Sequence, residues 1–219
     1  MSLRLRLILL ALAVFLPALV AALWVIDRAY ASERAGVERA LRETTRALSL
    51  VVEGELGKRE TVARVLADSP YLDAAPNLAD ADLRRFDEQA RRATEGLGGW
   101  VALSTPQGQV LSTLHPRGEA LTPLAPGLPG AYPYAAEAPT LSALIKGAVG
   151  GRLAASLQMP VIRDGKTLMN VGLTVPATEL QRLVDSRRMP AGWITAVIDS
   201  EGTLAARNPD PERWVGASS

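Results

Sequence analysis

The strongest pattern along the chain is an apolar run from Leu7 to Ile26 that contains no charged residue. About twenty residues at 1.5 Å per residue span a bilayer core of ~30 Å. Its many Leu, Ile, Val and Phe residues each favour insertion by roughly 0.3–0.6 kcal/mol, together more than Pro17 opposes. Arg4 and Arg6 precede the run, so the positive-inside rule places the N-terminus in the cytoplasm. The pattern predicts a transmembrane anchor.

A cleaved signal peptide is the alternative interpretation, because Ala29 to Ala31 form the sequence AYA, which resembles a cleavage site. The apolar core of a signal peptide is usually about 7–15 residues long, and this run exceeds that length. The length favours an uncleaved anchor, with residues 1–31 forming the cytoplasmic N-terminus and the membrane span. Both interpretations export residues 32–219.

From residue 32 to about residue 67 the chain contains no proline, and apolar or tolerated residues recur at steps of three and four, as in an amphipathic helix. The positions that share this stripe are Val37, Leu41, Thr44, Leu48, Val51, Val62 and Val65. Gly54 and Gly57 interrupt the stripe, which predicts a kink or a weakened packing patch. The stripe packs on its own domain or on a second copy, and we expect a homodimer through residues 33–66.

A second helix and a hairpin follow this first helix. Pro70 ends the first helix, and Asp80 is placed to cap the second. The buried side of the second helix is predicted to hold Leu83, Phe86 and Ala90. After Gly98, apolar and polar residues alternate on both sides of the turn TPQGQ, which predicts a β-hairpin. The apolar positions of this predicted hairpin are Trp100, Ala102, Val110 and Leu114.

Residues 115–138 are rich in proline and show little periodicity, so they predict a packed loop that covers part of the domain. Three strand-like stretches follow within residues 140–175, separated by VGGR and by the hairpin turn RDGK. After Pro176 the segment ATELQRLVDSRR predicts a short amphipathic helix. The order of elements indicates an α+β fold with a five-stranded antiparallel sheet and flanking helices.

Composition excludes several function classes. The formal net charge is +1 and the basic residues are dispersed, which argues against a nucleic-acid partner. The absence of Cys excludes disulfides, Cys-based zinc sites and thiol nucleophiles. His115 is the single histidine, it precedes Pro116, and no GxSxG motif accompanies it. No D-x-D-x-D-G loop is present either, so we expect no catalytic residue, no metal and no cofactor.

An ordered series of motifs runs through residues 139–216: GR before a strand, PVIRDGK at the hairpin, L..L in the helix, and then GWITAVIDSEGTLAARNPDPERWVG. With these motifs the chain resembles the extracytoplasmic PAS-like, or Cache, sensor region (double-Cache type) of bacterial membrane histidine kinases. The resemblance extends from the anchor to the last residue and is strongest over residues 139–216. The resemblance implies a five-stranded antiparallel sheet behind a long helix, in one or two tandem copies.

The same resemblance implies a receptor region at the bacterial inner membrane, with residues 32–219 in the periplasm. Residues 32–190 would form the PAS-like sensor domain. Residues 191–219 would begin a second, membrane-proximal module with a hairpin. Because the chain has no ATP-binding or phosphoacceptor segment, we expect it to be non-catalytic and its full-length parent to be a histidine kinase.

The resemblance also implies a small-molecule pocket between the sheet and the proline-rich loop. Residues that combine hydrogen-bonding groups with apolar or charged surface near this loop are Trp100, Arg117, Tyr132, Tyr134, Lys146 and Arg152. Two or three converging positive charges beside tyrosines would suit an anionic ligand. The tyrosine, arginine and tryptophan cluster that marks amino-acid-binding double-Cache members is not visible at the expected place before the loop, which argues against an amino-acid ligand.

Two other hypotheses remain open from sequence. The first is an anchored periplasmic module that dimerises and binds a protein partner without a small ligand. The second is an exported enzyme, for which the sequence offers no recognisable nucleophile, phosphate-binding loop or carboxylate pair. The C-terminal hairpin must dock on the preceding domain, pair with another chain or stay poorly ordered, because its apolar positions need a core.

Overall fold

The computed structural model forms two compact units, residues 1–50 and residues 51–219. The residues that it describes are 3–75, 77–105, 108–117, 119, 121, 138–146, 151–186 and 192–218. Within residues 3–35, the side chains of 3–15, 17, 18, 29, 31 and 35 lie outside this description. The predicted domain boundaries after residues 31 and 190 stay predictions.

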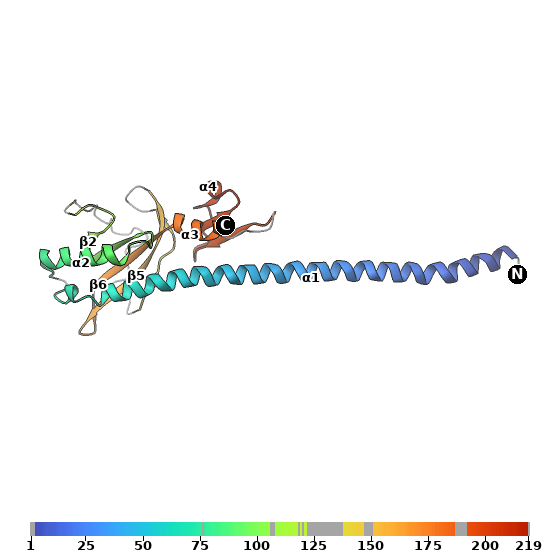
Figure 1. Ribbon diagram of the computed structural model, residues 1–219, viewed down its shortest axis with the longest axis horizontal. Coiled ribbons are helices and arrows are strands. Elements are labelled where there is room, and N and C mark those ends of the chain that lie inside the picture. Colours follow the sequence, from blue (N-terminus) through green and yellow to red (C-terminus); the bar gives the residue numbers. More distant parts are fainter. Residues whose placement is uncertain are drawn as a thin grey trace. The chain divides into compact units, whose positions relative to one another are not determined.

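The first element is a single long helix, α1 (Leu3–Ala67), whose last turns belong to the second unit (Figure 1). The helix passes through Gly54 and Gly57 without a break; the kink or weakened packing patch expected there stays a prediction. Within the part of the chain whose side chains are described, no helix is both long enough and apolar enough to span a membrane. The anchor predicted at Leu7 to Ile26 overlaps undescribed side chains and remains a prediction.

A short 3₁₀ helix, η1 (Pro70–Leu72), and helix α2 (Asp80–Ala93) follow α1. Ser69 caps η1 by accepting a hydrogen bond from the backbone N–H of Tyr71. The predicted cap of α2 was wrong by one residue: Ala79 is the N-cap and Asp80 is already helical, where its charge still favours the positive helix end. Phe86 and Ala90 are buried on the inner side of α2, as predicted.

The main sheet has six strands rather than the predicted five. The strands are β1 (Trp100–Thr105), β2 (Gly108–Ser112), β3 (Thr140–Leu141), β4 (Ile145–Lys146), β5 (Leu153–Arg163) and β6 (Lys166–Pro176). Their order is β2-β1-β6-β5-β3, and β4 also pairs with β5; all pairings are antiparallel. The extra strand arises because the first predicted stretch is split. Between β3 and β4, the backbone N–H of Ser142 still donates to the carbonyl of Ser156 at 2.9 Å, but the N–H of Ser156 donates to Ser142 Oγ, at 2.9 Å, in place of a backbone carbonyl.

The β5–β6 hairpin shows how the sequence sets the register. Its two turn residues, Asp164 and Gly165, both have positive φ, at 51° and 71°. A two-residue turn of this kind matches the natural twist of the strands it joins. The predicted RDGK turn is therefore confirmed, and it aligns the ten residue pairs from Ala154↔Pro176 to Arg163↔Lys166.

One face of the sheet carries the hydrophobic core against α2 and the end of α1 (Figure 1). The core residues of the sheet are Val101, Leu103, Leu111, Leu157, Met159, Val161, Met169, Val171 and Leu173. They alternate along β1, β5 and β6, so they share one face of the sheet. The helices supply Ala63, Leu66, Phe86 and Ala90 opposite them. A fully buried large side chain of this kind contributes roughly 1.5–3 kcal/mol.

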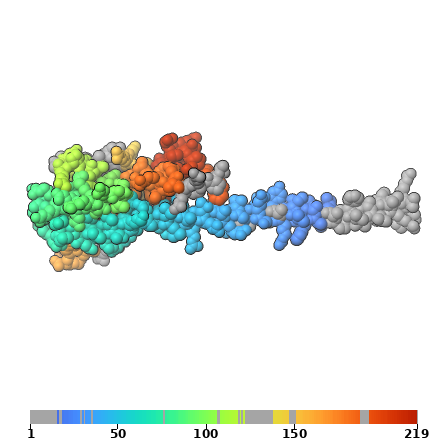
Figure 2. Space-filling model, viewed as in Figure 1, coloured from blue at the N-terminus to red at the C-terminus, as the bar shows by residue number. Residues whose placement is uncertain are grey.

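The C-terminal residues dock on the preceding domain. Helix α3 (Ala177–Asp185) follows β6 directly, and a separate two-stranded sheet is formed by β7 (Thr195–Ile198) and β8 (Leu204–Asn208), with α4 (Pro211–Trp214) after it. Figure 2 shows α3 and this hairpin packed together. The Gln181 amide on α3 binds both backbone groups of Arg207 on β8, at 2.8 Å each. Of the three outcomes expected for this hairpin, docking is the one observed.

The carboxylate of Asp199 makes a second set of contacts that attaches the β7–β8 hairpin to the domain. Asp199 accepts hydrogen bonds from the backbone N–H groups of Glu201 and Thr203 in the β7–β8 turn, and from that of Leu144, at 2.8–2.9 Å. Burial tends to raise the pKa of Asp199, but these backbone donors outweigh it and hold the pKa below its ordinary value. The turn is thereby attached to the segment between β3 and β4.

Candidate functional site

The second face of the sheet, opposite the core, is polar and buried. Positions of the other parity along β1, β5 and β6 lie on this face. Its buried polar residues are Ser104, Ser156, Gln158, Asn170 and Thr174. We call these five residues, together with Trp100, Ala102 and Gly172, the polar face. Burying hydroxyl and amide groups costs free energy unless they find hydrogen-bond partners, so such a face needs partners or a ligand.

The strand register arranges the polar face in three rows. The upper row pairs Ser104 with Asn170, and the lower row pairs Trp100 with Thr174 and Thr174 with Ser156. The middle row pairs Ala102 with Gly172 and Gly172 with Gln158. The two smallest residues therefore lie side by side in the middle of the face, where they form a shallow floor.

Gln158 lies across Gly172, and its amide is partly unpaired. A Cβ atom on Gly172 would come within 2.6 Å of Gln158 Nε2 and 3.2 Å of Ser156 Oγ, so glycine is required to make room for these groups. Gln158 Nε2 donates a 2.6 Å hydrogen bond to Ser156 Oγ. Gln158 Oε1 is buried and has no hydrogen-bond partner among the described residues. A buried acceptor of this kind is a candidate contact for a ligand.

Access to this face exists beside Gln158. Ala102 and Trp100 are half-buried, whereas Val101 and Leu103 on the core side are completely buried. Solvent therefore reaches the floor of the polar face at Ala102. This combination of an accessible floor and buried polar walls is the arrangement expected of a small-molecule site.

The predicted site residues are not all brought together. Trp100 lies on the polar face. Arg117 follows β2 at one edge of the sheet, whereas Lys146 on β4 and Arg152 before β5 are exposed near the other edge. The predicted converging positive charge is therefore absent among these three side chains. Tyr132 and Tyr134 lie outside the described residues, as does most of the predicted covering loop.

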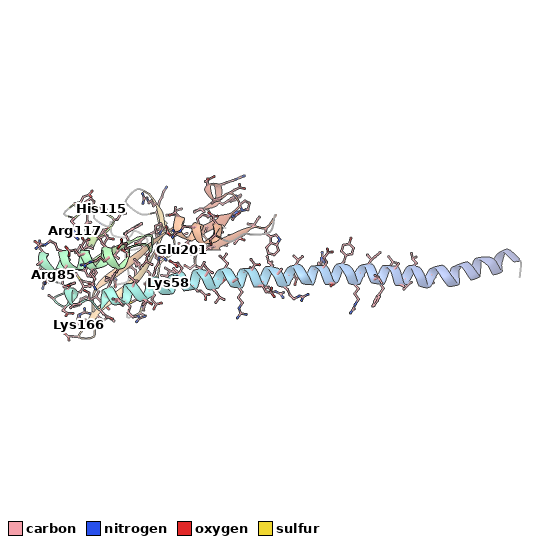
Figure 3. The ribbon with its side chains drawn as sticks, viewed as in Figure 1. Lys58, Arg85, His115, Arg117, Lys166 and Glu201 are labelled. Carbon is pink, nitrogen blue, oxygen red and sulfur yellow. The ribbon has the colours of Figure 1, made fainter. Side chains whose placement is uncertain are left out.

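Arg117 lies beside α2 (Figure 3), where it belongs to an ion-pair network. Its guanidinium donates to Asp87 at 2.6 Å and to Glu88 at 3.1 Å. The hydrogen bond with Asp87 raises the pKa of Arg117 above its ordinary value. Arg91 donates to both carboxylate oxygens of Asp87 at 3.0 Å and also to the carbonyl of His115 at 2.7 Å. The network ties the segment after β2 to α2.

A cavity of about 540 Å³ lies between α2 and the edge strand β2, next to this network. Its apolar part includes Leu83, Val110 and Leu121, and its rim carries Asp87 and Arg117. The charges of Asp87 and Arg117 are paired with each other rather than left for a ligand. We therefore interpret the residues around this cavity as structural. The candidate site is placed on the polar face.

A buried arginine positions the start of β1, where the polar face begins. Arg59 on α1 is buried, and its guanidinium donates to Glu55 and to the carbonyl oxygens of Leu97 and Gly98. Burial tends to raise the pKa of Glu55, but the hydrogen bonds and charges of Arg59 and Lys58 together outweigh it and hold that pKa below its ordinary value. The contact fixes the chain two residues before Trp100.

Sequence reasoning missed Ser156, Gln158, Asn170 and Thr174, which are four of the five buried polar residues of the polar face. The signal was available in the alternation of β5 and β6, where polar residues share one parity and large apolar residues the other. That pattern is normally taken as a solvent-exposed side. The structure shows instead that these polar side chains are buried.

No group of three or more metal-ligating side chains occurs among the residues that the structure describes. The candidate site is therefore defined by hydroxyl and amide groups. These groups can orient a small molecule by hydrogen bonds, and none of them is activated for nucleophilic or acid–base chemistry in the described geometry.

The sequence matches no known protein-family model, and no curated protein matches it. Solved structures do share the fold. The ligand-binding domain of the Pseudomonas fluorescens chemoreceptor CtaA, in complex with L-serine, has 17% identity and a TM-score of 0.65; the match covers 84% of this chain and 77% of that chain. The ligand-binding domain of the Campylobacter jejuni chemoreceptor Tlp3, in complex with L-valine, has 16% identity and a TM-score of 0.56, covering 80% and 71%. The chain therefore has the fold of chemoreceptor ligand-binding domains.

Proposed function

We propose that this chain is the extracytoplasmic ligand-sensing region of a membrane-anchored receptor, with the polar face as its ligand site. The observation that carries the proposal is the unpartnered, buried Gln158 Oε1 above a solvent-accessible floor, as seen among the described residues. The shared fold supports it, because CtaA and Tlp3 hold small amino acids in domains of this architecture. The ordered motifs over residues 139–216 support a sensor of the histidine kinase type, and a kinase encoded in frame with this region would test that part.

The anchor and the location form a separate part of the proposal. The uncharged run from Leu7 to Ile26 is long enough to span a bilayer, and the arginines before it favour a cytoplasmic N-terminus. Among the described side chains of this run, Leu19 and Leu23 are about 60% exposed. Residues 32–219 would then lie in the periplasm. Alkaline phosphatase fused after residue 31 should be active, and a fusion before Leu7 should be inactive; the reverse result would contradict this orientation.

Signalling would use α1, because this one helix contains both the predicted anchor and the Arg59 contact to Gly98, two residues before β1. A ligand shifts such an element only through its different affinity for two states. Exposed apolar residues along α1, among them Val37, Leu41 and Leu50, support a homodimer through residues 33–66.

A ligand screen tests the sensing function. The 219-residue chain in detergent would be mixed with amino acids, organic acids, sugars and polyols, and its melting temperature recorded. A ligand at a hundred times its Kd adds about 2.7 kcal/mol of stability, enough to shift the melting temperature by several degrees. A binder whose effect is reduced by substitutions on the polar face supports the proposal, and no binder in any class contradicts it.

An anchored interaction module without a small ligand is the second candidate. The exposed apolar residues of α1 favour it as well, since a helix-mediated assembly needs no pocket. Light scattering tests the central claim of this candidate, which is dimerisation. A chain that stays monomeric in detergent at high concentration would contradict this candidate, but it would not contradict ligand sensing.

A further inference from the structure

We propose that the ligand of the polar face is an uncharged small molecule that carries hydroxyl or amide N–H donors. This inference rests on the proposed sensing function and concerns the class of ligand. It follows from three properties of the polar face: an unsatisfied acceptor, the absence of charge among its described residues, and a small floor beside an aromatic ring.

The unsatisfied acceptor defines the group that the ligand must present. Gln158 is 4% exposed, and its Nε2 is committed to Ser156 Oγ at 2.6 Å. The other end of the amide, Oε1, has no partner within the described part of the chain. An acceptor left unpaired in a buried position costs about 1–3 kcal/mol. A ligand that donates an O–H or N–H group to Oε1 recovers this cost, so a donor is the required feature.

The described residues of the polar face carry no ionisable side chain. Ser104, Ser156, Gln158, Asn170 and Thr174 offer hydroxyl and amide groups alone. Of the three cations that were predicted to reach a ligand, Arg117 is bound to Asp87 and Glu88, and Lys146 and Arg152 are exposed near the far edge of the sheet. A charged ligand group buried here would lose its hydration without gaining an opposite charge from these residues, which is unfavourable. An uncharged ligand has no such penalty.

The floor and its border fit a compact molecule with both polar and apolar parts. Ala102 and Gly172 lie side by side in the middle of the face, and solvent reaches Ala102. Trp100, half-buried in the next row, offers an aromatic surface to C–H groups. Small polyols, sugars and amides combine such C–H groups with neutral donors. They therefore match the floor, the aromatic border and the acceptor at the same time.

The experiment compares three probe classes on the complete chain in detergent by titration calorimetry and thermal melting. The uncharged probes are myo-inositol, D-ribose and acetamide; the zwitterionic probes are L-serine and L-alanine; the anionic probes are acetate and succinate. The expected result is binding of at least one uncharged probe, with the zwitterionic and anionic probes inactive. Binding of L-serine, L-alanine or an anion instead overturns this inference and leaves the sensing function intact. No binding in any class overturns both.

Two substitutions then locate the binding probe. Gln158→Leu removes the acceptor while keeping a side chain of similar size, and should weaken the probe's affinity about tenfold, the loss expected for one hydrogen bond. Gln89→Leu makes the same chemical change on α2, on the core side, and should leave the affinity unchanged. If Gln158→Leu fails to fold, Ala102→Val provides the test, because it fills the accessible floor with a residue that suits a strand. Unchanged affinity in a folded Gln158→Leu or Ala102→Val variant overturns the assignment.

Discussion

The guanidinium of Arg59 on α1 donates a 3.2 Å hydrogen bond to the carbonyl oxygen of Gly98, two residues before β1. Glu179 on α3 also approaches Gly98, because a Cβ atom there would lie 2.6–2.7 Å from the carboxylate oxygens of Glu179. Two helices thus meet at one backbone position. The start of the polar face is fixed by both of them.

Arg59→Met should destabilise the domain by about 3 kcal/mol, because it leaves the partly buried Glu55 and two carbonyl oxygens without their partner. Urea denaturation followed by circular dichroism measures this free energy of unfolding. Arg64→Met is the matched control on the same helix: Arg64 pairs with Glu60 in an exposed ion pair, worth roughly 0–1 kcal/mol. Equal losses in the two variants would contradict the role of Arg59.

Gly99→Ala should be more damaging than an ordinary glycine substitution. Gly99 has φ of 133°, and an added Cβ would collide with the carbonyl oxygen of Thr174 on β6. Gly108 has φ of 138°, and among the described residues no atom would lie within 4 Å of an added Cβ, so Gly108→Ala measures backbone strain alone, about 1–3 kcal/mol. We expect Gly99→Ala to cost at least about 1 kcal/mol more, from the steric overlap. A smaller loss in Gly99→Ala than in Gly108→Ala would refute the close approach.

Asp199 should make the stability of the domain depend on acid pH. Its pKa is lowered in the folded state from an ordinary value of 3.8, so the unfolded state binds a proton first as the pH falls. The contribution of Asp199 is therefore complete above about pH 4 and is lost as the pH drops through the lowered folded value.

Asp199→Asn tests this dependence. The side-chain oxygen of asparagine still accepts from the turn, but its amide nitrogen cannot accept from Leu144, at a cost of about 1 kcal/mol. The difference in melting temperature between the natural chain and the variant should shrink as the pH falls from about 4 toward the lowered folded pKa. A constant difference across that range would show that Asp199 does not titrate as described.

Arg117→Met should leave the affinity for any ligand of the polar face unchanged, because Arg117 is engaged by Asp87 and Glu88. Titration calorimetry with the binding probe makes the measurement, with Gln158→Leu as the sensitive comparison. A loss of affinity in Arg117→Met equal to that in Gln158→Leu would restore Arg117 as a ligand residue and displace the polar face.

Much of the fold could be predicted from local pattern. The end of α1 before Pro70, the buried side of α2, the RDGK hairpin and the helix after Pro176 all follow from periodicity and turn chemistry. The split between β3 and β4 could not be predicted, because it depends on the contact of Ser142 with a strand distant in sequence. The cap of α2 was misplaced for a related reason: aspartate favours both the cap and the first turn.

The candidate site was less predictable than the fold. Alternation along β5 and β6 places Ser156 and Gln158 on one face, but it does not reveal whether that face is exposed or covered. Arg117 was selected for its charge, and its neighbours Asp87 and Glu88, about thirty residues earlier, could not be identified as its partners from spacing. Of the predicted residues, Trp100 lies on the polar face.

The Gln181 amide gives Arg207 on β8 the same pair of hydrogen bonds that a neighbouring strand would give. Further along β8, Leu204 exchanges backbone hydrogen bonds with Gly216 and Ala217 at 2.8–2.9 Å. The outer edge of β8 is therefore occupied at both positions. In the described structure the opposite edge, along β7, pairs with no further strand, and Ile194 and Ile198 beside it are exposed. Any strand that extends this small sheet must therefore join at β7, so the hairpin can grow in one direction alone.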